Sequence, residues 1–234
     1  MFPVLELIYL GIEILSLYVI FLYVPDVLGL TFYDLSLYVT ISNASIMAIS
    51  GFGIWIIQSV TSGSLNNLLI RPANELLLMT EFNLYGIMST VFSVILLIVL
   101  CIIFPQKITF LNFILMSITL IISLPLFLLP VLTIRSLSFW FGPVYPLESA
   151  FRSITQSFRE YPMIILSRVF FVVFVSITPV GYLGWYLSLM ILIGKVSYSW
   201  MLWMWLLTIV LDVLMWFVFR FVYKRGLRRY EGFA

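Results

Sequence analysis

The chain has 234 residues, of which 63% are hydrophobic and 9% charged, and its mean hydropathy is +1.18. Soluble domains carry roughly 25% charged residues and roughly 45–50% apolar ones, so this composition excludes a soluble protein. The net charge of +2 is too small to indicate a nucleic-acid partner. The apolar runs are continuous instead of alternating, which predicts membrane-crossing helices and not a membrane β-barrel.

Six runs are apolar enough to cross the ~30 Å hydrocarbon core, which takes about 20 helical residues. In chain order, these expected spans are Val4–Val24, about Leu37–Ile57, Leu84–Phe104, Phe110–Thr133, Pro162–Ile177 and about Tyr198–Val222. Pro125 and Pro130 lie inside the fourth span, and membrane helices tolerate such prolines better than soluble helices do. We therefore predict an all-α integral membrane protein, with residues 1–234 forming one transmembrane domain.

The apolar segment Thr178–Gly194 does not fit this series, because it contains Pro179, Gly181 and Gly184 between two good spans. A complete seventh span would put the basic C-terminal tail on the opposite side from the other basic loops. A short re-entrant or broken hairpin, buried against protein, fits better.

Basic residues are distributed unequally between the two sides of this arrangement. One side carries nine: Arg71, Arg135, Arg152, Arg159, Arg220, Lys224, Arg225, Arg228 and Arg229. The other side carries only Lys107 and Lys195. Cytoplasmic loops are enriched in Lys and Arg, so we expect both termini to be cytoplasmic. The basic tail after the last span acts as a membrane anchor in the simplest interpretation.

The loop Thr61–Asn74 predicts a short amphipathic helix at the cytoplasmic face. Ser64 can cap this helix, and Pro72 limits it because a proline disfavours helical geometry in the residue before it. The apolar positions recur at helical spacing, at Leu65, Leu68 and Leu69. This is the shape of a coupling element, and the alternative is an interfacial loop helix without a further role.

A second amphipathic pattern covers Pro143–Glu160. Its apolar face comprises Leu147, Ala150, Phe151, Ile154 and Phe158, and its polar face comprises Glu148, Arg152, Gln156, Arg159 and Glu160. This pattern is typical of a helix in the membrane interface. Such a helix can equally help to dock a cytoplasmic partner.

Three ionisable residues fall inside expected spans: Glu13, Arg168 and Asp212. A charge in the bilayer is costly unless it is paired, protonated or facing water, so each is a functional candidate. The alternatives are a structural ion pair or a side chain that reaches back to the interface. We expect Asp212 to face protein or a water-filled path, with Arg168 as a candidate partner. A protonated Asp212 bonded to a neighbouring helix is the alternative.

Catalytic patterns are missing from the sequence. The single Gly-Lys pair, Gly194-Lys195, lacks the upstream glycine and the Ser or Thr of a phosphate-binding loop. The chain has no histidine, and Cys101 is its only cysteine. We therefore expect no enzyme activity, no metal site, no cofactor and no intrachain disulfide.

The segment Gly63–Pro72, Gly-Ser-Leu-Asn-Asn-Leu-Leu-Ile-Arg-Pro, resembles the G-x-L-D-x-x-L-x-R-P signature of an ABC transporter permease family of bacteria and archaea, the type-two exporter class. Further matches follow in the same order, covering roughly residues 35–230: Phe139-Trp140, Tyr161-Pro162, Ile177-Thr178-Pro179 and Gly226–Tyr230. Two departures are visible. Asn66 replaces the usual Asp, and no basic amphipathic helix precedes the first span, which suggests a shortened N-terminus or a misplaced start.

The resemblance implies a membrane subunit of an ATP-driven exporter in a bacterial or archaeal cell membrane, which moves a drug, peptide or lipid out of the cytoplasm. It implies two kinds of partner: a cytoplasmic ABC ATPase subunit that binds the ATP, and a second permease, identical or homologous, which is another candidate partner for Asp212. It also makes Thr178–Gly194 an extracellular hairpin. The ATPase-coupling residues would be Ser64, Leu65, Asn66, Asn67, Leu68, Leu69, Arg71 and Pro72. The competing hypothesis is an ATP-independent channel or scaffold component.

Overall fold

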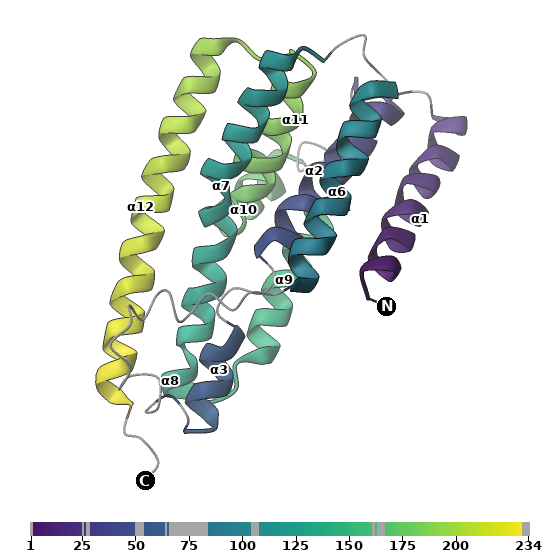
Figure 1. Cartoon of the computed structure of the whole chain (residues 1–234). Helices are drawn as coiled ribbons and strands as arrows, with labels where there is room; N and C mark the ends of the chain where they lie inside the picture. Colours follow the sequence, from purple (N-terminus) through teal and green to yellow (C-terminus); the bar gives the residue numbers. More distant parts are fainter. Residues whose placement is uncertain are drawn as a thin grey trace.

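The computed structural model of the chain describes residues 2–24, 26, 29–49, 54–63, 65, 84–103, 108–160, 162 and 167–230. These residues form helices and no β-strand, which confirms the predicted all-α class. Most of the helices run side by side along one direction (Figure 1).

Two long helices, α7 (Phe110–Ser136) and α12 (Tyr198–Arg229), pack against each other along the bundle (Figure 1). Thr109 caps α7, because its Oγ1 accepts a hydrogen bond from the Asn112 backbone N at 3.2 Å. The two helices are also joined by Trp205, whose Nε1 donates to Thr119 Oγ1 at 2.9 Å. Within the described part of the chain, these are the two helices that are long and apolar enough to cross a membrane alone.

A second group contains α1 (Phe2–Tyr23), α2 (Phe32–Ile49) and α6 (Leu84–Ile103). Asp34 stabilises the start of α2, since its Oδ2 accepts from Thr31 N at 3.0 Å and from Thr31 Oγ1 at 3.1 Å. The predicted second span, Leu37–Ile57, is covered by α2 and by a separate helix, α3 (Ile54–Thr61). Residues 50–53 between them lie outside the described residues.

Helix α2 is buried although it is rich in small polar residues. Their hydroxyls bond to the helix's own backbone one turn earlier: Thr40 Oγ1 donates to Ser36 O at 2.8 Å, and Ser45 Oγ donates to Ile41 O at 2.9 Å. A hydroxyl satisfied in this way can be buried without leaving an unpaired polar group. Three other polar side chains of α2, Tyr38, Ser42 and Asn43, bond to other helices and are described below.

The segment around the predicted hairpin contains α10 (Arg168–Ile177), the π-helix η3 (Val180–Tyr186) and α11 (Leu187–Leu192). Residues 170–177 and 180–192 meet at an angle of 86°, so together they form either one broken span or a re-entrant element. Residues 180–192 are a single helical stretch, and the predicted extracellular hairpin is not confirmed. The predicted number of six spans is not confirmed either, since two helices qualify, or three with this bent pair.

A close packing contact explains one of the glycines in this segment. A Cβ atom added to Gly184 would lie 2.8 Å from Ser123 Oγ on α7, so a larger residue would force the two elements apart. Trp185, the next residue, is completely buried. The η3–α11 stretch is therefore an internal element of the bundle.

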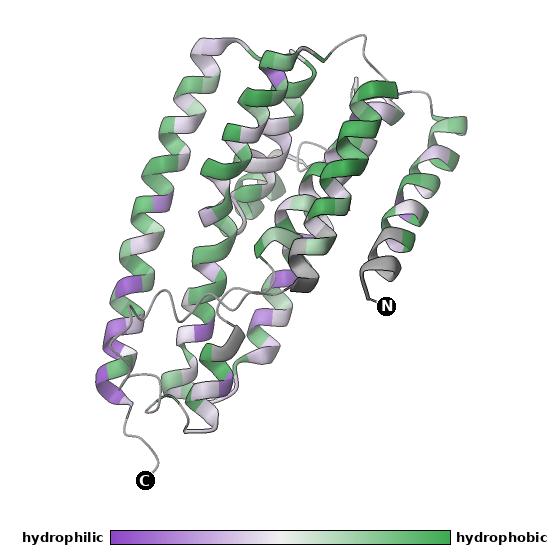
Figure 2. Cartoon of the chain, in the orientation of Figure 1, coloured by the Kyte–Doolittle hydropathy of each residue, from purple (hydrophilic) through white to green (hydrophobic). Residues whose placement is uncertain are grey.

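Hydrophilic residues gather at one end of the bundle, where α12 terminates (Figure 2). We call it the basic end, because it contains α12 residues Arg220, Lys224, Arg225, Arg228 and Arg229. It also contains α8 (Ser138–Phe141) and α9 (Tyr145–Glu160) (Figure 1). At the opposite end, Lys195 Nζ donates to Gly29 O at 3.1 Å.

Candidate functional site

Helix α9 is the amphipathic element of the basic end and corresponds to the predicted segment Pro143–Glu160. Glu148 lies in its first turn and Arg159 in its last turn, the placement that complements the helix dipole. Both of these charged side chains are buried, at 7% and 5% exposure. Buried charges require partners, and each end of α9 finds them on different helices.

At the first end, Arg135 from the last turn of α7 forms two hydrogen bonds to Glu148. Arg135 Nη2 donates to Glu148 Oε1 at 2.6 Å, and Arg135 Nε donates to Oε2 at 2.9 Å. Glu148 Oε1 also accepts from Arg152 Nε at 2.8 Å, one turn further along α9. We call these three residues the α7 contact. A two-pronged pair between guanidinium and carboxylate fixes direction as well as distance, so α9 is held in one orientation on α7.

The two arginines determine the ionisation of Glu148. Burial by itself raises the pKa of its carboxyl, but the hydrogen bonds and positive charges of Arg135 and Arg152 outweigh that effect. The pKa of Glu148 is consequently held below its ordinary value. Glu148 is therefore a permanent carboxylate at neutral pH, and its role is to hold helices together.

At the second end, the Arg159 side chain reaches α1 and α2. Its Nη2 donates to Glu13 Oε1 at 2.8 Å, and its Nη1 donates to Asn43 Oδ1 at 2.9 Å. Asn43 Nδ2 then donates to Ser93 Oγ of α6 at 2.9 Å. We call these four residues the span contact. A single arginine thus joins α9 directly to α1 and α2, and Asn43 extends the connection to α6.

The same end of α9 is tied to α2 through its backbone. The last carbonyls of a helix have no partner within the helix. Tyr38 donates its hydroxyl to the carbonyl of Phe158, and Ser42 Oγ donates to Arg159 O at 3.2 Å. These two bonds cap the C-terminal end of α9 with side chains of α2, so the position of α9 depends on α2 as well as on the Arg159 side chain.

These contacts make α9 a link between two groups of helices. One end is bonded to α7 and the other to α1, α2 and α6. Because buried charged hydrogen bonds are costly to break, the two attachments fix the position of α9 on both groups of helices. No proton transfer or nucleophilic chemistry is required of these side chains.

The structure assigns the three predicted intramembrane candidates to different environments. Glu13 belongs to the span contact and pairs with Arg159. Arg168 begins α10, but its side chain lies outside the described residues. Asp212 is half-buried on α12, and its Oδ1 has no hydrogen-bond partner among the described residues. The pairing of Asp212 with Arg168 stays a prediction.

The predicted ATPase-coupling segment is described only at Leu65. That side chain is 2% exposed and packs with Ile56, Val60, Leu132 and Phe219, which come from α3, α7 and α12. Leu65 therefore contributes to the core of this chain. The other predicted coupling residues lie outside the described residues: Ser64, Asn66, Asn67, Leu68, Leu69, Arg71 and Pro72.

Sequence reasoning did not single out Asn43 or Tyr38. The available signal was an amide side chain in the middle of an apolar span, which marks a contact between membrane helices. The amphipathic pattern of Pro143–Glu160 placed Arg159 on the polar face of α9, whereas the structure buries the Arg159 side chain.

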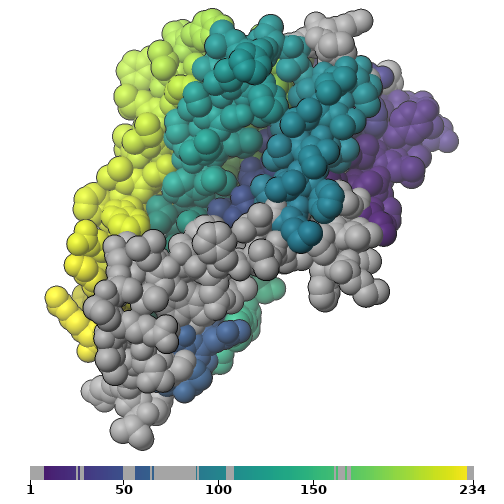
Figure 3. Space-filling view, in the orientation of Figure 1, coloured from purple at the N-terminus to yellow at the C-terminus, as the bar shows by residue number. Residues whose placement is uncertain are grey.

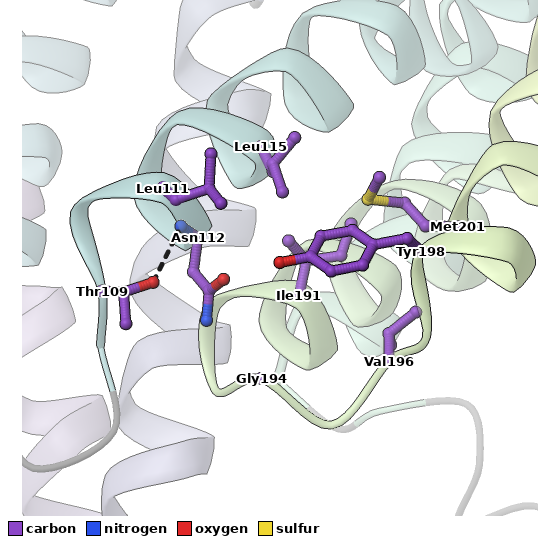
Figure 4. Close-up of a pocket in the computed structure, with 9 residues that line it drawn as sticks. All are labelled: Thr109, Leu111, Asn112, Leu115, Ile191, Gly194, Val196, Tyr198 and Met201. Carbon is purple, nitrogen blue, oxygen red and sulfur yellow. Dashed lines mark hydrogen bonds between the residues drawn. The ribbon is translucent and has the colours of Figure 1, made fainter.

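A pocket of about 440 Å³ lies at the opposite end, between α7, α11 and α12 (Figure 4). Leu115 and Met201 supply apolar walls, and Thr109, Asn112 and Tyr198 supply polar atoms. The Tyr198 hydroxyl points across the pocket toward the Asn112 side (Figure 4). These groups allow apolar contacts and neutral hydrogen bonds.

Comparison with known proteins identifies the family. No curated protein and no solved structure matches the chain. A family model described as "ABC-2 family transporter protein" matches residues 7–234, nearly the whole chain. Permeases of this family generally work with a separate ATPase subunit. The all-helical, apolar structure agrees with a membrane protein of this kind. The chain belongs to the ABC-2 transporter family and is a membrane permease subunit of an ABC transporter.

Proposed function

We propose that the chain is the permease of an ATP-driven exporter and that α9 carries the movement of the ATPase subunit to the membrane helices. The observation that carries the proposal is the double attachment of α9 through buried charged bonds, to Glu13 and Asn43 at one end and to Arg135 at the other. The ATPase subunit would dock at the basic end, against α9 and the Ser64–Pro72 segment. A second permease, identical or homologous, would complete the transport path.

In the proposed coupling cycle, α9 and its two contacts would act as follows. ATP binding closes the nucleotide-binding subunits and pushes on α9 at the membrane surface. The α7 contact keeps α9 aligned on α7, while the span contact transfers the displacement to α1, α2 and α6. These two groups of helices would then change their relative position and open the path to the other side. The cargo would be amphiphilic or hydrophobic, such as a drug, a peptide or a lipid, because apolar and aromatic residues dominate the helices.

Co-purification tests the proposal most simply. The tagged permease, extracted in mild detergent, should bring down a phosphate-loop ATPase in a fixed ratio, and ATP hydrolysis by the complex should drive uptake of a fluorescent phospholipid or drug into inside-out vesicles. Leu68→Asp should reduce partner binding or coupling without lowering the melting temperature. Leu65→Ala is the matched control. Because Leu65 is buried within the chain, this substitution should lower the melting temperature instead. Uptake that is indifferent to ATP would indicate a channel or scaffold.

Export also requires the proposed orientation, with the basic end and both termini in the cytoplasm. In a chain with Cys101→Ser, a cysteine at Lys195 should react with an impermeant maleimide from outside whole cells. A cysteine at Ser149, which is exposed on α9, should react only after lysis. Asp34 also lies on the predicted outer side, but it is unsuitable for this test. Its side chain is buried at the start of α2, where it accepts a hydrogen bond from Thr31 N. Labelling of Ser149 in intact cells would contradict the orientation.

A further inference from the structure

The last turns of α12 present a strongly basic face. Six residues line an open depression of about 630 Å³: Phe217, Arg220, Phe221, Lys224, Arg225 and Arg228. Successive residues of a helix are rotated by about 100°, so these six positions fall on one side of α12, within an arc of about 140°. We call this side the basic face. It combines two aromatic rings with four cations.

The opposite side of α12 is held against the bundle. Phe219 and Tyr223 are buried at 1% and 7% exposure, in the cluster that includes Leu132 of α7. A Cβ atom at Gly226 would collide with the ring of Phe139 on α8, so only glycine permits this approach. Because α12 cannot rotate without losing these contacts, the basic face is fixed at the edge of the molecule, where Figure 3 shows the end of α12.

Among the residues that the structure describes, no carboxylate pairs with the cations of the basic face. The ion pairs among the described residues involve Arg135, Arg152 and Arg159, and none of them involves α12. All four cations of the basic face are exposed. Arg225 lies over the ring of Phe221, with its Cζ 5.7 Å from the ring centre, so one guanidinium is placed beside an aromatic surface.

The length of α12 locates the basic face relative to the bilayer. Its 32 residues extend about 48 Å, whereas the hydrocarbon core is about 30 Å thick. The last turns therefore pass beyond the core into the headgroup layer. Phe217, Arg220 and Phe221 then lie near the acyl-chain boundary, and Lys224, Arg225 and Arg228 lie at the depth of the lipid phosphates, toward which the long Arg220 side chain can extend.

We propose that the basic face of α12 is a binding site for an anionic phospholipid. The phosphate would bind between Lys224 and Arg228, which are one turn apart, with Arg220 and Arg225 beside them. The acyl chains would pack on Phe217 and Phe221. Clusters of cations directly after a membrane helix favour anionic over neutral lipids, and this site adds a fixed geometry to that attraction. The proposal requires α12 to cross the membrane, but it does not depend on transport or on the ATPase.

Native mass spectrometry of the purified chain tests the site. The chain is reconstituted into nanodiscs of phosphatidylcholine with phosphatidylglycerol, and the lipids retained on release are counted. The chain should retain phosphatidylglycerol in preference to phosphatidylcholine. Arg228→Gln should lower that preference about fivefold, the equivalent of ~1 kcal/mol for one charge at the surface. Arg229→Gln is the matched control, since Arg229 is exposed, adjacent and at the same depth but lies outside the basic face.

Each outcome decides the proposal. A larger loss for Arg228→Gln than for Arg229→Gln supports a site of defined geometry, and equal losses would show only a diffusely positive helix end and overturn it. The variant with Gln at all four basic positions should lose the preference while keeping its melting temperature, because none of these side chains is buried. If that variant retains phosphatidylglycerol but no longer holds its ATPase subunit, the basic face binds an acidic protein surface and the lipid proposal is wrong.

Discussion

The two ends of α9 are held by the same kind of bond but join different parts of the chain. Arg135 and Glu148 are 13 residues apart, so the α7 contact closes a short unit of α7, α8 and α9. Arg159 and Glu13 are 146 residues apart, and the span contact joins α9 to helices from the N-terminal half of the sequence. The first contact is expected to form early in folding and to stay rigid, since it closes a short loop.

The partners of the two contacts also differ in number and type. The α7 contact concentrates two arginines on one carboxylate, with the Arg135 side chain completely buried. The span contact distributes one arginine over a carboxylate and an amide on two helices. We infer that the α7 contact mainly stabilises the fold, whereas the span contact mainly transfers movement of α9 to α1, α2 and α6. Substitutions at the two ends should therefore separate stability from coupling.

The largest effect on stability is expected for Arg135→Met. It leaves the buried Glu148 carboxylate with Arg152 alone, and removal of one member of a buried ion pair costs about 3–5 kcal/mol. The unfolding midpoint of the detergent-solubilised chain measures the loss. Arg135→Met/Glu148→Leu should recover part of it, because no buried carboxylate is left and the Arg152 side chain, which loses its partner, is partly exposed. A double variant that is less stable than the single one would contradict this interpretation of the α7 contact.

A smaller loss of stability, about 1.5–3 kcal/mol, is expected for Arg159→Gln, since its charged hydrogen bonds to Glu13 and Asn43 are broken. Glu13→Gln and the double variant complete a thermodynamic cycle. The two substitutions should be non-additive by at least about 0.5 kcal/mol, because the residues are directly bonded. Strict additivity would show that the Glu13–Arg159 pair contributes nothing to stability.

Acid should weaken the α7 contact selectively. The pKa of Glu148 in the folded chain lies below its ordinary value, so its stabilising contribution is complete above the unfolded pKa of about 4.3. That contribution is lost as the pH falls through the lower folded value. Melting temperatures measured from neutral pH downward should therefore fall more steeply below pH ~4.3 for the unaltered chain than for Glu148→Gln. Parallel curves of melting temperature against pH for the two chains would contradict the lowered pKa of Glu148.

The smallest effect is expected for Arg152→Gln, about 0.5 kcal/mol. The Arg152 side chain is 23% exposed, it pairs with Glu148 within one helix, and Arg135 keeps the carboxylate paired after the substitution. The same unfolding measurement checks it. A loss as large as that of Arg135→Met would mean that the two arginines act as one unit and would remove the distinction between them.

The sequence predicts the membrane class of this chain well, because that class depends on composition and long apolar runs. The predicted spans Phe110–Thr133 and Tyr198–Val222 correspond to α7 and α12, which extend a few residues further. The amphipathic pattern also predicts α9 to within two residues of its start. Patterns within each segment, apolar runs for α7 and α12 and amphipathic spacing for α9, are enough to predict these three helices.

Long-range contacts could not be derived in the same way. The sequence did not predict that Glu13 pairs with Arg159, because the packing of helices decides which charges meet. The pairing of Asp212 with Arg168 stays a prediction. The π-helix Val180–Tyr186 has no periodic signal either, and the close approach of its Gly184 to Ser123 of α7 is likewise a long-range contact. Arg159 was assigned to the outward face because α9 was considered without the helices that cover it.

The central claim, that α9 passes motion to the spans through Arg159, is tested most directly by a distance measurement. In a chain with Cys101→Ser, spin labels are attached at Leu22 on α1 and Leu202 on α12, which are 63% and 58% exposed. With the ATPase subunit bound, trapping of nucleotide by vanadate should change the distance between the labels in the otherwise unaltered chain and in Arg152→Gln. Arg159→Gln should hydrolyse ATP with no change in that distance. A full distance change in Arg159→Gln would contradict the claim.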